Sequence, residues 1–554
     1  MHGARRVARV LLINPVVREE DVPRHIPYGI ALLAAIARDA GHQVAVYDAN
    51  AWRQPISKVE DACKADDWDV IAVGGLTTTY GCIKQICRIA KTAAPRSLLV
   101  AGGGFLTSMP REVMTWLPEI DVGIVGEAFV TFPEILRMAG ERDRDFSSTL
   151  GVIWRGPEGE PLLNEARPVI HDLDRIPWPA WEFFPLEEVY FKNSSALFSE
   201  EAYRATRRID INGSYGCSLI CRYCWHLGTT GDMLVERTPS GDRDVVFTYG
   251  RNLRFHSPEY IVSMVGELKR RYQIDFANFL DENLMTMDTS SGHRWLGEIC
   301  EAWERAGLVP DRRAPSGTRQ SGVFWSGTSH ASLYRKPLLE KMYAAGCTHL
   351  VYGLESFDPS ILKRLGKGTS RQNNIDAIGD TMRAGIIPIP NIILGFPEET
   401  FESVRNTITA LLKLGIHARP HFATAYPGSE WYYAYKEIIR AQYGGDLEAY
   451  ILDLGDATKI TATISHSFTG LELLGLQEIV AKRDLRLLDL AEKAWKPKTL
   501  AAPAPSFNFR PKREPGPITI PIAVSRTRPS SDGVRQAPSI AQQQERDSAP
   551  LPLA

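Results

Sequence analysis

Two series of short apolar runs, each alternating with amphipathic segments, restrict the fold of this chain more than any other feature. In the first series, residues 7 to about 135, runs such as VARVLLINP and DVIAVGGL alternate with helical patterns such as YGIALLAAIARDAG. Strands alternating with helices predict an α/β domain with a doubly wound parallel sheet. These strands end in Gly, Asp or Asn, where such sheets bind ligands. We therefore expect a ligand site there, although tight turns alone would explain any single glycine.

The second series, residues 205 to about 430, repeats a strand and a helix six times. Its strands are expected within RRIDINGS, IDFANFLDEN, GVFWSGTSH, THLVYGLES, IPNIILGFPEET and ARPHFATAYPGS. Six such repeats predict a partial (β/α)6 barrel. In barrels of this kind the face formed by the C-terminal ends of the strands carries the chemistry.

The chain has 554 residues, which is too long for one ordinary domain. We expect the parallel-sheet domain at 1–140, a Pro-rich connector at 141–204, the barrel at 205–430, a small helical segment at 431–496 and a tail at 497–554. The tail is dense in Pro, Ser, Arg and Gln and shows no helix or strand periodicity. It cannot bury enough apolar surface to offset chain entropy, so the sequence predicts that it is disordered.

Charge and hydropathy argue against several functions. The formal net charge is −2, so no global field favours binding to nucleic acid or to an anionic membrane. No stretch approaches the roughly 18 apolar residues of a membrane span. The arginines near the N-terminus precede an apolar run, but no signal-peptide cleavage site follows. Only one group of cysteines is tight, which argues against a secreted disulfide framework. We expect a soluble, cytoplasmic protein that acts on a small molecule.

The segment GCSLICRYCWH, residues 216–226, places Cys217, Cys221 and Cys224 in the spacing C-x3-C-x2-C. One possibility is a structural zinc site, for which His226 would be the fourth ligand because no second ligand pair follows downstream. The other is a four-iron cluster held by three thiolates, with one iron left open. Location favours the cluster, because the cysteines follow the first barrel strand, where barrel enzymes place catalytic groups.

With these cysteines, residues 205–430 resemble the radical S-adenosylmethionine superfamily, whose signature is this spacing with an aromatic residue, here Tyr223, before the last cysteine. GLES (353–356), LGFPEET (394–400) and YPGS (426–429) are similar to further motifs of that family at the ends of its last three strands. The resemblance implies a 4Fe-4S cluster and S-adenosylmethionine bound to its open iron. It also implies cleavage to a 5′-deoxyadenosyl radical by an electron from an external donor such as flavodoxin or ferredoxin.

The same resemblance implies roles for single residues. Tyr223 would lie near the adenine, and Glu355 would help to hold S-adenosylmethionine. LDEN stands where the family usually has a glycine-rich motif, so Asp281 and Glu282 become candidates for binding the methionine amino group. Three histidines are equally consistent with substrate contact and with packing: His226, His330 and His421.

The first domain resembles the cobalamin-binding domain that precedes the radical domain in one large subgroup. PYGIALLAAIARDAGHQVAVYDAN and DVGIVGEAFVTF carry this resemblance. The Asp-x-His-x-x-Gly motif that supplies a histidine to cobalt is absent, which fits either no cobalamin or the subgroup's frequent lack of that ligand. By position, contacts with cobalamin would come from strand-end residues: Asn14, Thr77, Gly102, Gly103, Gly104 and Glu127.

Together the two resemblances imply a methyltransferase acting on an unactivated carbon or phosphorus centre. A radical formed on the substrate by hydrogen abstraction would take a methyl group from methylcobalamin, so the cofactors carry the difficult steps. The alternatives are an oxidative cyclase or ring-rearranging enzyme that uses cobalamin without methyl transfer, and a cobalamin-binding sensor or zinc-binding protein. Methylthiolation of transfer RNA is disfavoured by the near-neutral charge.

The segment 225–256, between the cysteines and the first barrel helix, is expected to be a long loop that shapes the substrate pocket. Its Gly, Thr and Asp content suits a polar metabolite. Within the family, the narrowest expectation is similarity to P-methyltransferases of phosphinothricin-type antibiotic biosynthesis, which act on a phosphinate.

Overall fold

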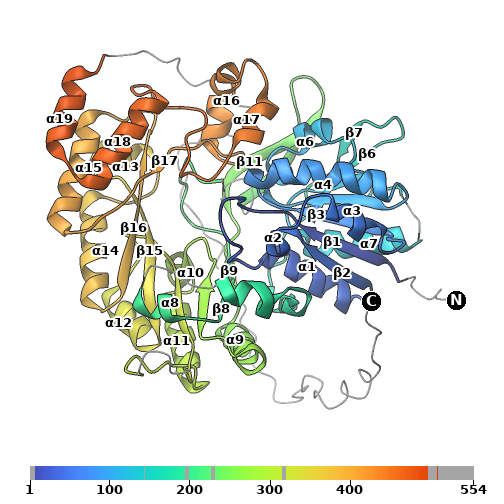
Figure 1. Ribbon diagram of the computed structural model, residues 1–554, viewed down its shortest axis with the longest axis horizontal. Helices are drawn as coiled ribbons and strands as arrows, with labels where there is room; N and C mark the ends of the chain where they lie inside the picture. The colour runs from blue at the N-terminus through green and yellow to red at the C-terminus, as the bar shows by residue number, and fades with distance from the viewer. Residues whose placement is uncertain are drawn as a thin grey trace. The chain divides into compact units, whose positions relative to one another are not determined.

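The first domain is built on a seven-stranded sheet in the order β2-β1-β3-β4-β5-β6-β7 (Figure 1). Its parallel strands are β1 (Arg9–Asn14), β2 (Gln43–Asp48), β3 (Val70–Gly74), β4 (Leu98–Gly102) and β5 (Val122–Ile124). The strand order reverses between β1 and β3, and in such sheets the ligand crevice lies at this reversal. Strands β6 (Val152–Arg155) and β7 (Pro161–Leu163) extend the sheet in antiparallel pairing.

The computed structural model describes residues 7–141, 144–193, 199–225, 231–314, 320–496 and Asn508. These residues all belong to one unit, Met1–Arg510. His226 and the tail predicted to be disordered, 497–554, lie outside the described residues, apart from Asn508. In the described ranges no helix is long and apolar enough to cross a membrane.

Helices cover both faces of the first sheet because its strands alternate apolar side chains toward each face. Val10 and Leu12 pack with α1 (Tyr28–Asp39) and α7 (Ala128–Glu141) on one face. Leu11 and Ile13 pack on the other face with a second group of helices: α3 (Lys58–Lys64), α4 (Tyr80–Ala93), α5 (Gly104–Ser108) and α6 (Pro110–Trp116). Two shorter elements follow strand ends: α2 (Ala49–Trp52) and η1 (Thr77–Thr79). The predicted doubly wound parallel sheet is therefore confirmed.

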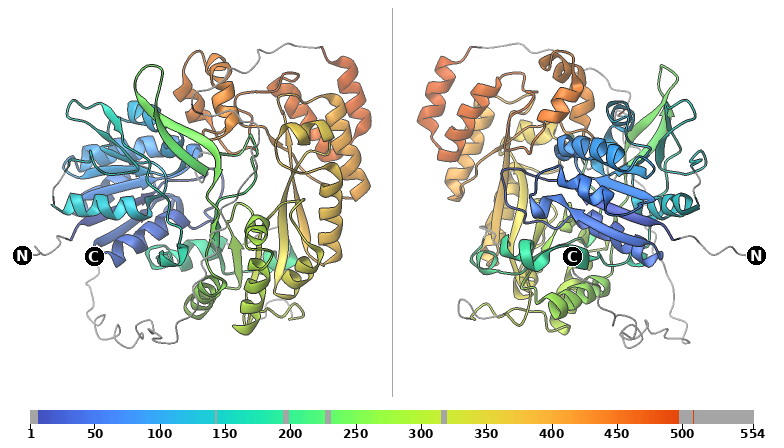
Figure 2. Two further views of the ribbon diagram at one scale, coloured as in Figure 1. Left: turned by 180° about the vertical axis from the view of Figure 1, so that it is seen from behind. Right: turned by 45° about the vertical axis from the view of Figure 1, so that its right-hand side comes forward.

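The barrel has six parallel strands, again as predicted, in the order β8-β13-β14-β15-β16-β17. They are β8 (Arg208–Ile211), β13 (Phe276–Phe279), β14 (Phe324–Ser329), β15 (Cys347–Glu355), β16 (Ile387–Leu394) and β17 (His421–Phe422). Figure 2 shows the strands curving into an open half-barrel with helices outside. The helices between strands are α9 (Pro258–Tyr272), α10 (Leu284–Ser290), α11 (Trp295–Arg305), α12 (Lys336–Ala344), α13 (Pro359–Arg364), α14 (Arg371–Arg383) and α15 (Phe401–Leu414).

Local sequence explains where the barrel helices begin. The Ser257 hydroxyl accepts a hydrogen bond from the Tyr260 N–H, with Pro258 in the first turn of α9. Ser370 and Thr400 each form a reciprocal capping box at the start of α14 and α15. These caps satisfy N–H groups that the helix itself leaves unpaired.

The segment between the cysteines and α9 is not the long loop that its composition predicted. It contains a hairpin of β10 (Gly231–Arg237) and β11 (Arg243–Arg251), followed by β12 (Arg254–Phe255), which pairs with β9 (Ser214–Tyr215). The Gly, Thr and Asp residues of this segment obscure the alternation of apolar and polar side chains that is typical of strands. The hairpin is stable only when another domain covers its apolar side chains. Val245 and Phe247 are buried in the core of the first domain, and the Phe247 ring centroid lies 5.7 Å from that of Tyr433.

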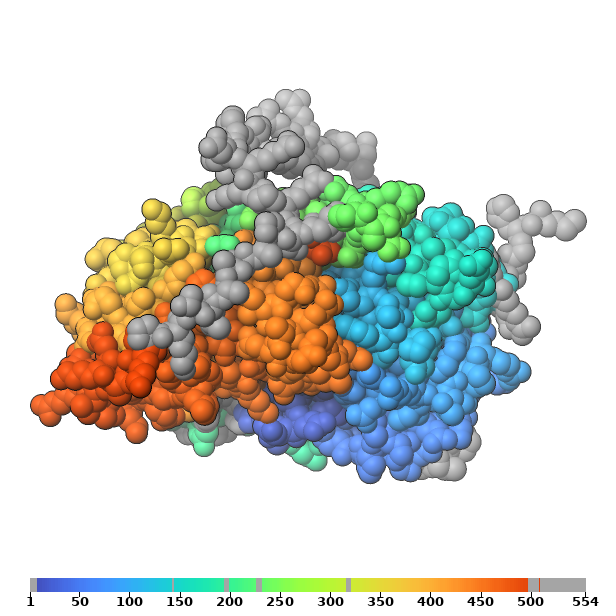
Figure 3. All heavy atoms as spheres, turned by 90° about the horizontal axis from the view of Figure 1, so that it is seen from above, coloured from blue at the N-terminus to red at the C-terminus, as the bar shows by residue number. Residues whose placement is uncertain are grey.

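Four helices complete the chain after the barrel: α16 (Glu430–Gln442), α17 (Leu447–Asp453), α18 (Gly470–Lys482) and α19 (Leu485–Ala494). Helix α16 reaches the first domain, where the Tyr433 hydroxyl donates to the Ser108 carbonyl at 2.8 Å. Viewed from above, the surface of α16 and α17 lies against that of the first domain (Figure 3). The connector contributes α8 (Glu200–Arg204) and several single turns: η2 (Leu173–Arg175), η3 (Trp181–Phe183), η4 (Leu186–Tyr190) and η5 (Phe191–Asn193).

Candidate functional site

The three clustered cysteines lie on a loop that follows β8 and β9 at the top of the barrel. The backbone of neighbouring segments holds this loop: the Arg222 N–H donates to the Leu365 carbonyl at 3.1 Å, and the Trp431 N–H donates to the Arg222 carbonyl at 3.2 Å. The Cys224 N–H closes a turn onto the Cys221 carbonyl at 3.0 Å. The loop is therefore anchored to the segments that follow the fourth and sixth barrel strands.

A zinc site and a 4Fe-4S cluster require different distances between the sulfur atoms of their cysteine ligands. Among the described residues, no three Cys, His, Asp or Glu side chains lie close enough together to hold one metal ion. Tetrahedral zinc with Zn–S bonds of about 2.3 Å would need sulfurs about 3.8 Å apart. A 4Fe-4S cluster binds each cysteine through a different iron, so its thiolates lie further apart. Cys217, Cys221 and Cys224 therefore stay the predicted ligands of the cluster, and His226, which a zinc site would need as its fourth ligand, lies outside the described residues.

A buried hydrogen-bonded triad lies beside the cysteines. The Tyr223 hydroxyl donates to Glu355 Oε1 at 2.8 Å, and Lys367 Nζ donates to the same oxygen at 2.6 Å. Lys367 Nζ also lies 3.2 Å from the Tyr223 hydroxyl. Burial raises the pKa of the Cys221 thiol to about 11, and the positive charge of Lys367 acts against this rise. The structure thus brings together two of the residues that the sequence predicted as cofactor contacts, Tyr223 and Glu355.

The local backbone makes room for this triad. Glu355 has φ of 61°, in the left-handed region that costs a non-glycine residue energy and is concentrated at functional sites. Gly353 lies in the same GLES motif, and a Cβ at this position would lie 2.5 Å from Lys367 Nζ. The triad therefore requires a glycine here. Sequence inspection missed Lys367. Its position between two glycines in LGKGTS, both with φ of 68°, was the available signal.

We expect Lys367→Met to weaken binding of S-adenosylmethionine at least about tenfold while the iron content stays unchanged. The substitution leaves Glu355 buried without its cation, and removing one partner of such a pair costs several kcal/mol. Equilibrium dialysis on the reconstituted enzyme would measure the affinity. Lys363→Met, at an exposed position on α13, is the control. Equal affinities in both variants would contradict a role for the triad.

The second-strand candidates, Asp281 and Glu282, already have partners within the protein. Asp281 is fully buried; its Oδ2 accepts from the Gly213 N–H at 2.9 Å and its Oδ1 accepts from the Ser214 hydroxyl. Glu282 Oε2 accepts from the Gly216 N–H at 3.2 Å, directly before the first cysteine. Burial raises the pKa of each carboxyl to about 7. These contacts give both residues a role in holding the cysteine loop, and binding of the methionine amino group stays a prediction.

Glu399 of the LGFPEET motif is a third buried carboxyl, accepting from the Gly395 N–H at 2.9 Å and the Ser403 hydroxyl at 2.8 Å. Burial raises its pKa from 4.5 to about 7. The folded chain thus keeps a proton that the unfolded chain releases, and this carboxyl increasingly destabilises the fold as pH rises from 4.5 to 7.

We expect Glu399→Gln, which cannot titrate, to gain stability relative to the wild type as pH rises through this window. The full gain is on the order of 3 kcal/mol. Thermal unfolding of the apoprotein at a series of pH values would measure it. Glu402→Gln changes an exposed carboxyl three residues later, in the first turn of α15, and should show no such trend. A pH-independent difference between Glu399→Gln and the wild type would contradict the assignment.

Two residues predicted to contact cobalamin have other partners in the structure. Glu127 receives both terminal nitrogens of Arg254, one of them at 3.0 Å, in a pair whose arginine side chain is only 3% exposed. Arg254 lies on β12, so this pair joins the first domain to the barrel. Asn14 Nδ2 donates to Asp48 Oδ1 at 2.7 Å, and both side chains are buried. Each prediction rested on position at a strand end, which does not reveal where a side chain points.

The glycines after β4 divide into two roles. Gly103 has φ of 99°, and a Cβ there would lie 2.5 Å from the Gly75 carbonyl oxygen, so the loops after β3 and β4 pack backbone against backbone. This packing requires a glycine at position 103, and contact of Gly103 with cobalamin stays a prediction. Gly102 ends β4 and hydrogen-bonds through its carbonyl to the Gly75 N–H at 3.2 Å. Gly104 instead lines a cavity.

That cavity, of about 210 Å³, lies between the first domain and the barrel. The first domain contributes strand-end residues that include Thr77, Thr78 and Gly104, and the barrel contributes Trp225, Tyr426 and Pro427. Trp225 directly follows the last cysteine. No histidine is among the described residues that line it, and His226, which follows Trp225, lies outside the described residues. Hydroxyl groups and a glycine backbone fit contact with the edge of such a ring.

Two of the three predicted histidines, His330 and His421, lie in the described residues. His330 is buried beside Ser332, and burial lowers its pKa to about 3, so it is neutral. His421 begins β17 and pairs in register with Ile393 of β16. Contact of either histidine with substrate stays a prediction.

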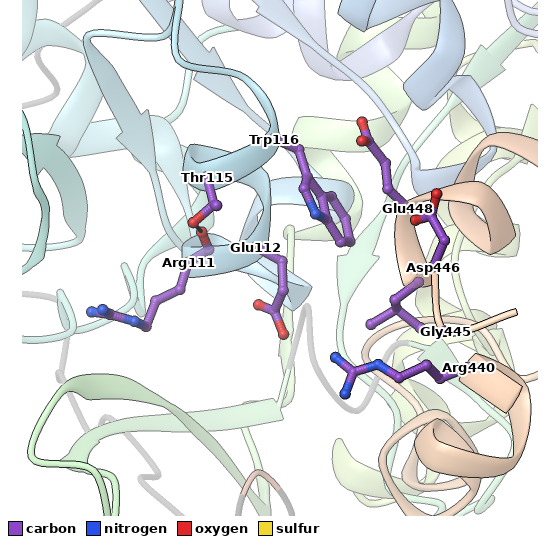
Figure 4. A pocket seen from close by; sticks show the side chains of 9 residues that line it. Arg111, Glu112, Thr115, Trp116, Arg440, Gly445, Asp446 and Glu448 are labelled. Atoms are coloured by element: carbon purple, nitrogen blue, oxygen red, sulfur yellow. Dashed lines mark hydrogen bonds between the residues drawn. The ribbon is translucent and has the colours of Figure 1, made fainter. Parts of the chain in front are cut away.

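A second, more open hollow of about 340 Å³ lies where α6 meets α16 and α17 (Figure 4). Its carboxylates are already paired: Glu112 with Lys436 at 2.6 Å, Glu448 with Tyr80 at 2.5 Å, and Asp446 as the cap of α17. It contains none of the predicted cofactor residues. We interpret it as a solvated seam between domains.

Comparison with known families matches the chain in two consecutive parts. Residues 15–136 match the B12 binding domain, and residues 211–411 match the Radical SAM superfamily. The first match contains the strand-end residues described above except Asn14, and the second begins at the end of β8 and contains the cysteine loop and the triad. The 4Fe-4S cluster, S-adenosylmethionine and cobalamin are the cofactors typical of this combination.

Among curated proteins, the chain is 27% identical to an uncharacterised methyltransferase of Pyrococcus horikoshii, covering 77% of this chain and 83% of the relative. It is 22% identical to the anaerobic magnesium-protoporphyrin IX monomethyl ester cyclase of Synechocystis, covering 76% and 77%. It is 24% identical to the cytidylyl-2-hydroxyethylphosphonate methyltransferase of Streptomyces wedmorensis, covering 66% and 68%.

Among solved structures, the radical S-adenosylmethionine methyltransferase TsrM of Kitasatospora setae shares the fold. The TM-score is 0.58 at 17% identity, covering 78% of this chain and 76% of that one.

Proposed function

We propose that this chain, a B12-binding radical SAM enzyme, is a methyltransferase for a small anionic metabolite. The observation that carries the proposal is the cavity shared by the two domains. Thr77 and Gly104, predicted to contact cobalamin, line it together with Trp225, which follows the cluster ligand Cys224. Methyl transfer from one cofactor to a radical generated by the other requires both to reach the same substrate atom.

The residues of the chain have distinct tasks in this proposal. Cys217, Cys221 and Cys224 hold the cluster, and an external flavodoxin or ferredoxin donates the electron. The Tyr223–Glu355–Lys367 triad orients S-adenosylmethionine beside it. When bound, the cluster and S-adenosylmethionine supply a hydrogen-abstracting radical, and methylcobalamin supplies the methyl group.

The lining of the cavity supports an anionic substrate. Arg18 lies on its wall and pairs with Asp456 at 3.1 Å, while its side chain remains 55% exposed. A guanidinium presents several N–H donors to a phosphorus or carboxylate oxyanion. The volume of about 210 Å³ is below the roughly 300–1,000 Å³ of pockets for drug-sized ligands, which favours a small substrate.

The narrow form of the proposal is P-methylation of a phosphinate, as in phosphinothricin-type antibiotic biosynthesis. Abstraction of hydrogen from a P–H bond would leave a phosphorus-centred radical that accepts the methyl group. Similarity to a methyltransferase named for a phosphonate substrate supports phosphorus chemistry in general. The alternative is an oxidative cyclase that uses cobalamin without methyl transfer, which the similarity to the protoporphyrin ester cyclase favours.

Incubation with methyl-labelled S-adenosylmethionine and an H-phosphinate amino acid, followed by phosphorus NMR, tests both forms. A labelled product with a new carbon-coupled phosphorus signal supports P-methylation. Labelled product formed only from a C–H substrate eliminates the narrow form and keeps the methyltransferase. Substrate consumption without label in any product would favour the cyclase. Arg18→Gln should raise KM for an anionic substrate more than it changes kcat.

A further inference from the structure

Arg251, at the end of β11, contacts the cysteine loop directly. Its Nε donates to the Leu219 carbonyl, between the first two cysteines, at 3.3 Å, and its Nη1 donates to the Gly250 carbonyl at 2.8 Å. The third guanidinium nitrogen, Nη2, is buried and has no hydrogen-bond partner among the described residues. A buried donor left unpaired is costly, so its retention points to a group that accepts from it.

The charge of Arg251 acts on all three thiols. Burial lowers its pKa, and negative charge on Cys217, Cys224 and Cys221 would act in the opposite direction. Asp232 is the nearest carboxylate that contributes to the same effect; its Oδ1 is held by Asn252 at 2.6 Å. Two other cations near these thiols are already paired: Lys367 with Glu355 at 2.6 Å, and Arg222 of the cysteine loop with Glu430 at 2.7 Å. Within the described residues, the Arg251 guanidinium instead donates to the backbone carbonyls of Leu219 and Gly250.

We propose that Arg251 is a positioning residue for the redox chemistry of the cluster, stabilising its reduced state through the unpaired Nη2 donor and its charge. The inference rests on the cluster assignment in the proposed function. One-electron reduction adds a negative charge to a site that already carries three thiolates. A half-buried cation at the site stabilises that added charge more than it would in water. Hydrogen bonds to sulfur and net charge are among the levers that set the potential of such clusters.

The hairpin strand β11 contacts both the first domain and the cysteine loop. β11 carries Phe247, buried in the first domain, and Arg251, which touches the cysteine loop. The same strand therefore links the packing of the first domain to the electrostatics of the cluster. Composition predicted a pocket-shaping loop here, and the structure assigns this segment a role toward the cluster instead.

The test is a potentiometric titration of the full-length reconstituted protein, monitored by electron paramagnetic resonance, on Arg251→Gln, Arg251→Lys and the wild type. Arg237→Gln, an exposed arginine on the same hairpin, is the control. We expect Arg251→Gln to lower the ratio of reduced to oxidised cluster at a fixed potential about tenfold, a shift of about 59 mV for a one-electron couple. Arg251→Lys should retain most of the wild-type ratio, and Arg237→Gln all of it.

An unchanged ratio in Arg251→Gln with a full complement of iron would overturn the inference. If Arg251→Gln takes up no cluster, Arg251→Met, which also removes the charge and the Nη2 donor, is titrated in its place: a tenfold lower ratio supports the inference, and a wild-type ratio overturns it. Iron content separates the two levels of failure. A wild type that binds no cluster refutes the assignment itself, whereas a loaded set of variants with identical potentials refutes only the role of Arg251.

Discussion

Cys221→Ala is expected to abolish both the cluster and the cleavage of S-adenosylmethionine. Three thiolates are the minimum that leaves one iron open, so losing one removes the anchor of the cluster. Iron content after anaerobic reconstitution should fall from about four per chain to near zero. Formation of 5′-deoxyadenosine should fall at least about 1,000-fold, since no other described group can replace the reductant at this site.

Cys63→Ala is the matched control for this prediction. Cys63 is buried in the core of the first domain, and burial raises the pKa of its thiol to about 11, as burial also does for Cys221. It should lose some stability as a cavity forms, yet keep the iron and the cleavage activity. Stoichiometric zinc in the wild type, without charge-transfer absorption, would overturn the cluster assignment.

Arg254→Met is expected to destabilise the protein by about 3–5 kcal/mol, because it leaves Glu127 buried at the domain boundary without its partner. The Arg254 guanidinium also lies 5.7 Å above the ring of Tyr215 and donates to the Ile170 carbonyl at 2.7 Å. The substitution removes these two contacts as well. Thermal unfolding of the apoprotein, with limited proteolysis to detect separation of the two domains, would measure the loss.

The double variant Glu127→Leu with Arg254→Met separates the charge effect from lost packing. Replacing both members of a buried ion pair by apolar side chains is often neutral, so the double variant should recover much of the stability lost by the single one. Arg243→Met, whose partner Glu165 is exposed, should change stability by less than about 1 kcal/mol. Equal losses in the single and double variants would show that Arg254 acts through packing alone.

Local patterns were sufficient wherever one element or one motif carries the information. The alternation of apolar runs with helices predicted both sheets, because parallel strands buried on two faces must be apolar throughout. The spacing of Cys217, Cys221 and Cys224, with Tyr223 between them, predicted the cluster site. In each case the residues that act together lie within a few positions of one another, or recur at the same end of successive strands.

Sequence reasoning could not supply the partner of a side chain where that partner comes from a distant part of the chain. Glu127 follows strand β5, as a ligand contact would, and its carboxylate pairs with Arg254, 127 residues later; contact with cobalamin stays a prediction. The hairpin at 231–251 was taken for a loop because the surface that covers Phe247 belongs to another domain. Lys367 passed unnoticed because its role depends on Glu355 and Tyr223, which meet it only in the folded barrel.

The sequence by itself therefore predicted the two kinds of sheet and their order, which follow from periodicity, and the class of cofactors, which follows from resemblance to known families; the cluster ligands stay a prediction from their spacing. Only the tertiary structure decided which strand-end residues face the shared cavity and which seal the boundary between the domains. It also decided that Arg251 lies beside the thiols. The physical reason is that burial and charge act through space, and the free energy of a buried carboxylate or guanidinium depends on partners that the sequence alone does not bring together.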